Sequence, residues 1–236
     1  MSSATVAVSV VLPAFNEEVL LAGCVRQLHG ALAALQVTAE IVIVDDGSRD
    51  GTPGIADQLA RELPGVIAVH QANQGIGGAF RTGVQRATGE YLVLWPADMP
   101  AEPGDLAPYT SRFGQADVIV GVRQARLGYN PLMRLNAWLY PRIVATLFGL
   151  HLRDVNWIHA YRRELFTRIT LTQRGIPMLV EALVRLRDLG ASFVEVDVTM
   201  KQRLGGVASA SRFRVMWRTL TGVMNFWKLW RKERRS

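Results

Sequence analysis

The sequence predicts an α/β protein built on a doubly wound, mostly parallel sheet, and three observations support this prediction. Short apolar runs of strand length alternate with segments of helix length through the first half of the chain. The runs are apolar throughout, as expected for parallel strands that are buried on both faces. Polar residues follow directly after the runs, where such strands end at the ligand-binding edge of the sheet.

Five runs are predicted as strands, at residues 6–15, 40–46, 65–71, 90–98 and 117–123. Helices are predicted between the first four, at residues 17–36, 53–63 and 75–88. After residue 125 the pattern is less regular, with an apolar helical stretch at 131–150, an extended segment at 153–166 and a late strand within 191–203.

The charge of the chain is concentrated at its C-terminus. Residues 1–200 hold 17 Lys+Arg and 19 Asp+Glu, whereas residues 201–236 hold 10 and 1. We therefore expect one body, residues 1–211, followed by a basic amphipathic helix, residues 212–236. A body without excess positive charge argues against nucleic-acid binding.

The C-terminal segment combines basic residues with an aromatic stripe at helical spacing, formed by Phe213, Trp217, Leu220, Met224, Trp227 and Trp230. We expect this helix, together with the apolar stretch at 131–150, to lie on an anionic membrane surface. The alternative is packing against its own core or a partner, either a membrane protein or a second copy. No apolar run reaches the roughly 18–20 residues that cross a bilayer. With a single cysteine and no signal peptide, we expect a cytoplasmic protein that is peripheral at the inner membrane face.

Several stretches occur in an order that resembles the family-2 glycosyltransferases with the GT-A fold. They are VVLPAFNEE (10–18), IVDDGSRDGT (43–52), NQGIGGAFRTGVQRATGEYLVLWPAD (73–98), DVIVGVR (117–123), DVNWIHAYRRE (154–164) and EVDVTMKQRLGG (195–206). Each stretch alone is weak evidence, but the ordered set is specific and spans nearly the whole chain. Within the family the set is most similar to polyprenyl-phosphate sugar transferases of the dolichol-phosphate mannose synthase type.

The resemblance implies a nucleotide-sugar donor, either a GDP- or a UDP-sugar. Asp45 or Asp46 would accept hydrogen bonds from the base, since an ionised carboxylate is only an acceptor. The alternative is that one Asp caps the following turn. The remaining residues expected around the donor are Pro13, Ala14, Asn16, Glu18, Asn73, Arg81 and Ala97.

The resemblance also implies a divalent cation, Mg²⁺ or Mn²⁺, at Asp98. The family normally has two carboxylates here, in a D-x-D pattern that holds the cation against the diphosphate of the donor. This chain reads WPADMP, with Pro96 where the first carboxylate is expected. Only Asp98 is therefore expected to serve the cation, and the alternative is a solvated Asp at the end of a strand.

The acceptor implied by the resemblance is a polyprenyl phosphate, whose own phosphate oxygen attacks the sugar with inversion. An ionised phosphate needs no general base, but cations must bring two anions together. Guanidinium groups match phosphate geometry. Arg123 and Arg134 are expected at the acceptor phosphate, and Arg203 at the donor or acceptor phosphate.

Two alternatives remain open. A glycosyltransferase with a saccharide hydroxyl acceptor would need a general base, for which Glu181 is the candidate. A nucleotide-sugar-binding protein without catalysis is the other, because Pro96 removes a carboxylate.

Overall fold

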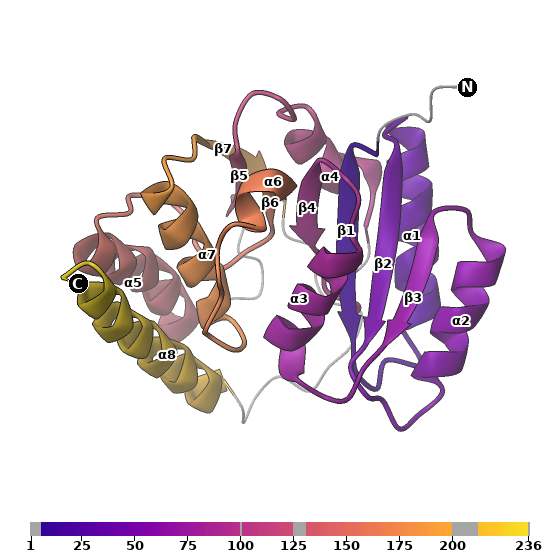
Figure 1. The fold of residues 1–236 in the computed structure, drawn as a ribbon, viewed down its shortest axis with the longest axis horizontal. Coiled ribbons are helices and arrows are strands. Elements are labelled where there is room, and N and C mark those ends of the chain that lie inside the picture. Colours follow the sequence, from indigo (N-terminus) through magenta and orange to yellow (C-terminus); the bar gives the residue numbers. More distant parts are fainter. Residues whose placement is uncertain (1–5, 100, 125–130, 200–211, 236) are drawn as a thin grey trace.

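The computed structural model describes residues 6–99, 101–124, 131–199 and 212–235. Its sheet has seven strands in the order β3-β2-β1-β4-β6-β5-β7 (Figure 1). The strands are β1 Val8–Ala14, β2 Ala39–Asp45, β3 Val66–His70, β4 Tyr91–Leu94, β5 Val118–Arg123, β6 His159–Arg162 and β7 Phe193–Val198. The helices are α1 Leu21–Ala34, α2 Thr52–Glu62, α3 Gly75–Arg86, α4 Pro103–Thr110, α5 Pro131–Phe148, α6 Arg163–Phe166, α7 Pro177–Asp188 and α8 Arg212–Glu233.

All the strands of this sheet except β6 run in one direction. β1 is parallel to β2 and β4, β2 to β3, and β5 to β7. β6 is antiparallel to both of its neighbours, β4 and β5, so those two strands share a direction. The carboxyl ends of the parallel strands consequently meet at one edge, and polar residues after β2, β4 and β5 face the same side of the molecule.

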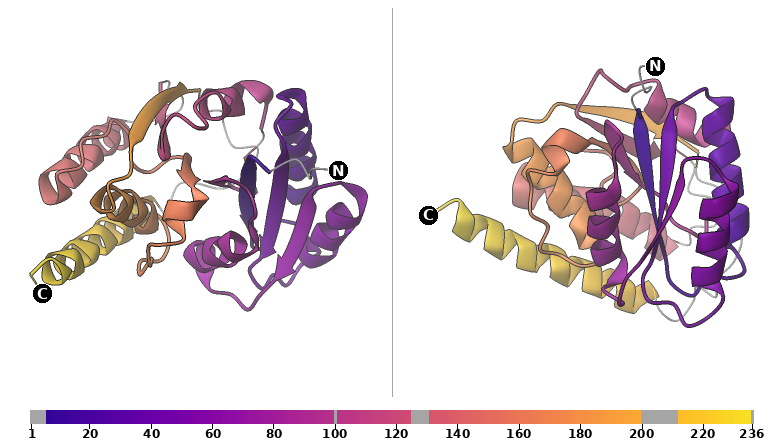
Figure 2. Two further views of the ribbon diagram at one scale, coloured as in Figure 1. Left: turned by 45° about the horizontal axis from the view of Figure 1, so that its top comes forward. Right: turned by 45° about the vertical axis from the view of Figure 1, so that its right-hand side comes forward.

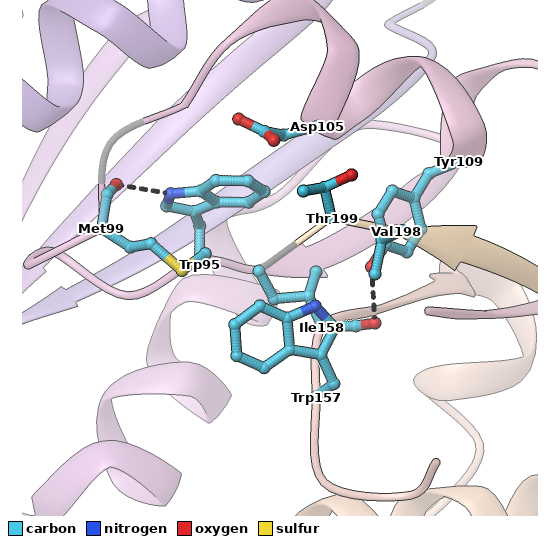
Figure 3. Close-up of a pocket in the computed structure, with 8 residues that line it drawn as sticks. All are labelled: Trp95, Met99, Asp105, Tyr109, Trp157, Ile158, Val198 and Thr199. Carbon is cyan, nitrogen blue, oxygen red and sulfur yellow. Dashed lines mark hydrogen bonds between the residues drawn. The ribbon is translucent and has the colours of Figure 1, made fainter. Parts of the chain in front are cut away.

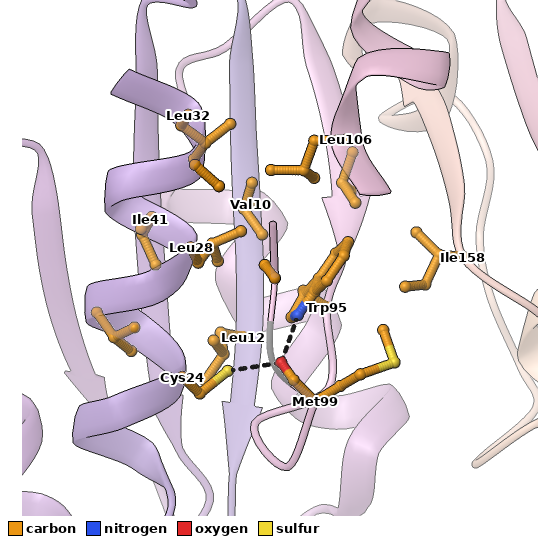
Figure 4. Packing of buried hydrophobic residues seen from close by; sticks show 14 of the residues in the cluster. Val10, Leu12, Cys24, Leu28, Leu32, Ile41, Trp95, Met99, Leu106 and Ile158 are labelled. Atoms are coloured by element: carbon orange, nitrogen blue, oxygen red, sulfur yellow. Dashed lines mark hydrogen bonds between the residues drawn. The ribbon is translucent and has the colours of Figure 1, made fainter. Parts of the chain in front are cut away.

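Helices cover both faces of the sheet (Figures 1 and 2). One apolar cluster packs α1, α2 and α4 against the first face, with Trp95 and Leu28 among its buried members (Figure 4). A second cluster packs α3, α5, α7 and α8 against the other face. Strands β1, β2, β4 and β5 are buried on both sides, which explains why their sequences lack alternation.

The predicted α/β sheet is confirmed, with one difference in strand direction. β6 lies within the segment predicted only as extended, and it enters the sheet between β4 and β5. The residues just before β6 are held at the carboxyl edge, because Asp154 pairs there with Arg123 at the end of β5. β6 therefore starts at that edge and runs against its neighbours.

The prediction for the C-terminal helix was only partly right. α8 begins at Arg212, as expected, but Val223 and Phe226 are buried in the second cluster. Trp227 donates to the Leu147 carbonyl at 3.0 Å, and Trp230 donates to Asp188 at 2.6 Å. These two tryptophans therefore pack against the body of the protein and not in a membrane-facing stripe. Among the described residues, no helix has the length and hydrophobicity needed to cross a bilayer.

Candidate functional site

Asp46 organises the start of α3. It is buried at the end of β2, where Oδ1 accepts from Gln71 Nε2 at 2.6 Å and from the Gln74 backbone N–H at 2.8 Å. Oδ2 accepts from the Gly75 N–H at 2.7 Å. A carboxylate is favourable here because the first N–H groups of a helix lack partners within it. Asp46 thus anchors the glycine-rich segment, and its predicted contact with a base stays a prediction.

Asp45 has different partners. Its Oδ1 accepts from the Ser48 N–H at 3.0 Å, which is the turn-capping contact considered as the alternative. Its Oδ2 lies 3.1 Å from His70 Nδ1, and the other ring nitrogen, Nε2, lies 3.0 Å from Asp57 Oδ1. These contacts with Asp57 and Asp45 raise the pKa of His70 above its usual value.

The loops after β1 and β2 are joined into one wall. Asn16 has a left-handed backbone with φ of 56°, and its N–H donates to Ser48 Oγ at 2.9 Å. In return, Asn16 Oδ1 accepts from the Arg49 N–H at 2.9 Å, and Glu18 Oε2 accepts from the Gly51 N–H at 2.7 Å. These bonds fix the wall before any ligand binds.

The other predicted donor residues lie along the same edge or close to it. Ala14 is opposite Asp45 in the β1–β2 register, and Pro13 precedes it. Asn73 Nδ2 donates to the Asp46 carbonyl at 2.9 Å. Arg81 is half-buried on α3.

The turn after β4 carries Asp98. The Met99 carbonyl accepts from Trp95 Nε1 at 3.0 Å and from Cys24 Sγ at 3.1 Å, which fixes this turn against α1 (Figure 4). Ala97 is buried within the turn, and Asp98 is half-buried. Burial raises the pKa of the Cys24 thiol to about 12, and the charges of Asp98 and Glu17 contribute to the increase. Glu17 is therefore a second carboxylate near this turn.

The carboxylates available as metal ligands near this turn suit only one mode of cation binding. Within the described parts of the chain, no group of three or more His, Cys, Asp and Glu side chains could hold a metal ion. Mg²⁺ is commonly bound by one or two carboxylates together with substrate phosphates. Asp98 therefore fits a cation shared with a diphosphate, and does not fit a cage made by the protein alone.

Arg123 lies in a buried polar cluster at the end of β5. Its Nε and Nη2 donate to the two Asp154 oxygens at 2.7 and 2.9 Å, and Nη2 also donates to Asn156 Oδ1 at 2.5 Å. The side chains of Arg123 and Asp154 are 8% and 1% exposed. The Arg123 guanidinium also lies over the Trp157 ring, 4.8 Å from its centroid. Because Asp154 compensates the charge, Arg123 holds the 154–157 segment, and its contact with an acceptor phosphate stays a prediction.

The two other predicted arginines differ in position. Arg134 is exposed in the first turn of α5. Arg203 lies outside the described residues.

A small pocket connects the Asp98 turn with the Arg123 cluster (Figure 3). Trp95 and Met99 line it from the first region, and Trp157 and Ile158 line it from the second. Tyr109 of α4 closes it by donating to the Ile158 carbonyl at 3.0 Å. The pocket shows that the residues flanking Asp98 and those contacting Arg123 lie side by side at the edge of the sheet.

Glu181, the candidate base of the hydroxyl-acceptor alternative, is buried and hydrogen-bonded within the protein. The side chain is 0% exposed on α7. Its oxygens accept from the Thr172 N–H at 2.9 Å, Thr172 Oγ1 at 2.9 Å, the Gln173 N–H at 2.7 Å and Arg185 Nε at 2.9 Å. The carboxylate instead holds the 172–173 segment against α7.

Several residues of this edge were not predicted from the sequence: Glu17, Asp57, His70, Asp154 and Asn156. One of them could have been found, because a buried strand that ends in Arg123 requires a carboxylate partner. Asp154 is the first residue of the DVNWIHAYRRE stretch, which lies within the segment predicted as extended. The contacts of His70 with Asp45 and Asp57 have no comparable signal in the sequence, because the packing of α2 brings Asp57 to the ring.

The comparisons with known proteins agree with this geometry. The chain is 30% identical over 217 residues to an undecaprenyl-phosphate mannosyltransferase of Micrococcus luteus, covering 85% of this chain and 86% of the relative. It is 30% identical over 221 residues to a polyprenol monophosphomannose synthase of Mycolicibacterium smegmatis, covering 86% of this chain and 80% of the relative. Both alignments extend over most of the two proteins compared.

A solved structure with a similar fold is the glucosyl-3-phosphoglycerate synthase of Mycobacterium tuberculosis in complex with Mn²⁺, UDP and glucosyl-3-phosphoglycerate. It superposes with a TM-score of 0.71 at 18% identity, covering 93% of this chain and 79% of that chain. The model of glycosyl transferase family 2 matches residues 9–170. The chain therefore belongs to glycosyl transferase family 2 and is a glycosyltransferase of the GT-A fold.

Proposed function

We propose that this enzyme transfers a sugar from a GDP- or UDP-sugar to a polyprenyl phosphate, with inversion, at the cytoplasmic surface of the membrane. The single observation that carries the proposal is the order of charges along the carboxyl edge of the sheet. Asp45 lies at the β2 end, Asp98 follows β4, and Arg123 ends β5. The two relatives named for polyprenyl-phosphate mannose transfer support the same acceptor class.

The donor binds against the wall formed by the loops after β1 and β2. Asp45 accepts from an N–H of the base, and the Asn16 and Glu18 contacts keep its loop in place. Such a wall is rigid before binding, which reduces the entropic cost of seating a polar ligand.

The acceptor phosphate supplies the nucleophile. One of its anionic oxygens forms a bond to the anomeric carbon as the bond from that carbon to the diphosphate breaks on the opposite face, which inverts the centre. A phosphate monoester carries between one and two negative charges near neutral pH, so no side chain has to remove a proton. A cation held between Asp98 and the diphosphate would neutralise charge on the leaving group.

The membrane-contacting surface is the exposed side of α5. Leu135 and Trp138 are each 54% exposed, and Leu139 is 42% exposed. The only charged residues of this helix are Arg134 and Arg142. An apolar face with cations and without carboxylates matches an anionic lipid surface. A lipid phosphate at this surface would be within reach of Arg134, which is exposed in the first turn of the helix.

A transfer assay tests the proposal. Purified protein is incubated with labelled GDP- and UDP-sugars, Mg²⁺ or Mn²⁺, and a short-chain polyprenyl phosphate. Label should move into the organic phase with one donor. Absence of lipid-linked label with every donor would reject the proposal.

A second candidate, a nucleotide-sugar-binding protein without transferase activity, is favoured by one observation, Pro96 in the position of a carboxylate. Calorimetry that finds donor binding, together with no turnover in Mg²⁺ or Mn²⁺, would support it. The hydroxyl-acceptor alternative is not favoured, because its candidate base, Glu181, is buried.

A further inference from the structure

His70 lies between two carboxylates that come from different elements. Its Nδ1 is 3.1 Å from Asp45 Oδ2 on β2, and its Nε2 is 3.0 Å from Asp57 Oδ1 on α2. The His70 side chain is 41% exposed, whereas the Asp45 side chain is 5% exposed. The ring therefore connects a surface carboxylate with a buried one.

This arrangement requires a proton on each ring nitrogen. Ionised carboxylates only accept hydrogen bonds, and a neutral imidazole has a single N–H. Both contacts can be hydrogen bonds at the same time only when the ring is an imidazolium. The charged groups that act on the ring are Asp57 of α2 and Asp45 of β2, and the remaining residues of β3, Val66 to Val69, carry no charge.

The imidazolium has a specific consequence for Asp45. A carboxylate buried this deeply is costly unless it is paired and hydrogen-bonded. His70 supplies the opposite charge at Oδ2, and the Ser48 N–H occupies a position at Oδ1. The carboxylate is thereby paired with an opposite charge and held in one orientation, as an acceptor for a base N–H must be.

We propose that His70 is a positioning residue for recognition of the donor's base: held by Asp57, it pairs with the Asp45 carboxylate and keeps it oriented toward the nucleobase. This inference rests on the proposed function, since it assumes a nucleoside diphosphate beside Asp45. It extends that function by assigning base recognition to a triad, Asp57–His70–Asp45, in which only Asp45 touches the ligand.

The test compares His70→Gln and Asp57→Asn with His29→Gln. His29 is a matched control, because its Nε2 also makes an interelement contact, at 3.1 Å to the Pro64 carbonyl. Calorimetry measures the Kd of GDP and UDP between pH 7 and 8.5. Competition with the bound nucleotide measures the Kd of inorganic pyrophosphate, which lacks the base. Thermal unfolding checks that every variant is folded.

His70→Gln should weaken nucleotide binding about tenfold at pH 7, as expected for loss of a charge-assisted contact, and leave pyrophosphate affinity unchanged. Asp57→Asn should have a smaller effect in the same direction, and His29→Gln none. Wild-type nucleotide affinity should decrease toward pH 8.5 as His70 loses its proton, whereas the His70→Gln affinity should change less. Nitrogen NMR shifts should show both His70 ring nitrogens protonated at pH 7.

Three results would overturn the inference. The first is that His70→Gln binds nucleotide as tightly as wild type. The second is that it loses affinity for nucleotide and for pyrophosphate to the same extent. The third is that the NMR shifts show a neutral His70 ring at pH 7. If His70→Gln does not fold, Asp57→Asn is used in its place, and either of the first two results for that variant would overturn the inference. If wild-type protein binds neither GDP nor UDP, the proposed function fails as well, which separates that failure from failure of the triad alone.

Discussion

The two ends of the carboxyl edge are built differently. At the β1–β3 end, Asp45, Asp46 and Asn16 are held by hydrogen bonds to neighbouring loops. At the β5–β7 end, one ion pair, Arg123 with Asp154, is buried, while Trp138 and Leu135 of α5 remain exposed. The first end suits a rigid polar ligand, and the second suits a flexible amphiphile with an anionic head. Under the proposed function, one sheet edge would serve two substrates of different character.

The largest expected effect comes from breaking the buried ion pair. Asp154→Ala leaves the Arg123 charge buried without its carboxylate, which should lower the free energy of unfolding by about 3–5 kcal/mol. Arg153→Ala is the matched control, because its pairs with Glu195 and Asp197 are exposed and should be worth about 0–1 kcal/mol. Denaturant unfolding measures both. Similar losses in the two variants would mean that the β5 end does not depend on the buried pair.

The same end should be sensitive to acid. Burial lowers the pKa of His159 from its usual 6.5 to about 4. The unfolded chain therefore binds a proton that the folded chain does not, and about 3 kcal/mol should be lost as the pH falls from 6.5 to 4. Unfolding of wild type and His159→Leu across this range isolates the effect, since other titrating groups are common to both. Parallel pH profiles would refute it.

Between the two ends, Asp98→Asn should reduce kcat about 100-fold, or about 2.7 kcal/mol, because the charge that holds a cation is lost. Nucleotide binding measured without metal should change little. Glu62→Gln, which alters an exposed carboxylate paired with Arg26, is the control. An unchanged kcat would show that the reaction does not depend on a carboxylate after β4.

Removing the apolar side chains of α5 tests the membrane assignment. Trp138→Ser combined with Leu135→Ser should reduce binding to vesicles of anionic lipid by at least about tenfold, since each buried side chain contributes about 1.5–3 kcal/mol. Ile67→Ser removes an apolar residue that is 36% exposed on β3, at the other end of the sheet, and should have no effect. Sedimentation with vesicles measures both; equal binding would place the contact elsewhere.

The smallest effect on catalysis is expected at Glu181. Glu181→Gln should lower the unfolding temperature, because a buried ion pair with Arg185 is lost, but kcat should stay within about twofold of wild type. A large decrease in kcat at an unchanged unfolding temperature would restore Glu181 as a base.

The sequence predicted the parallel strands and their shared edge because both follow from local patterns. Apolar runs without alternation identify buried strands, and residues such as Asp45 and Asp98 mark where the strands end. Long-range pairing was not predictable in this way. The contact of Asp46 with the start of α3 spans 29 residues, and the contact of His70 with Asp45 spans 25.

The role of α8 shows a second limit. Spacings of three and four residues place Trp227 and Trp230 on one stripe, and such a stripe packs equally well on a lipid surface or on a protein core. Only the position of Phe148 and α7 decides that these tryptophans contact the body.

The central claim is that the nucleophile is a phosphate presented at the β5 end. The most direct measurement compares a polyprenyl phosphate with the polyprenol of the same chain length, each with the same labelled nucleotide sugar. Labelled lipid is expected from the phosphate and none from the alcohol. Transfer to the alcohol at a comparable rate would contradict it.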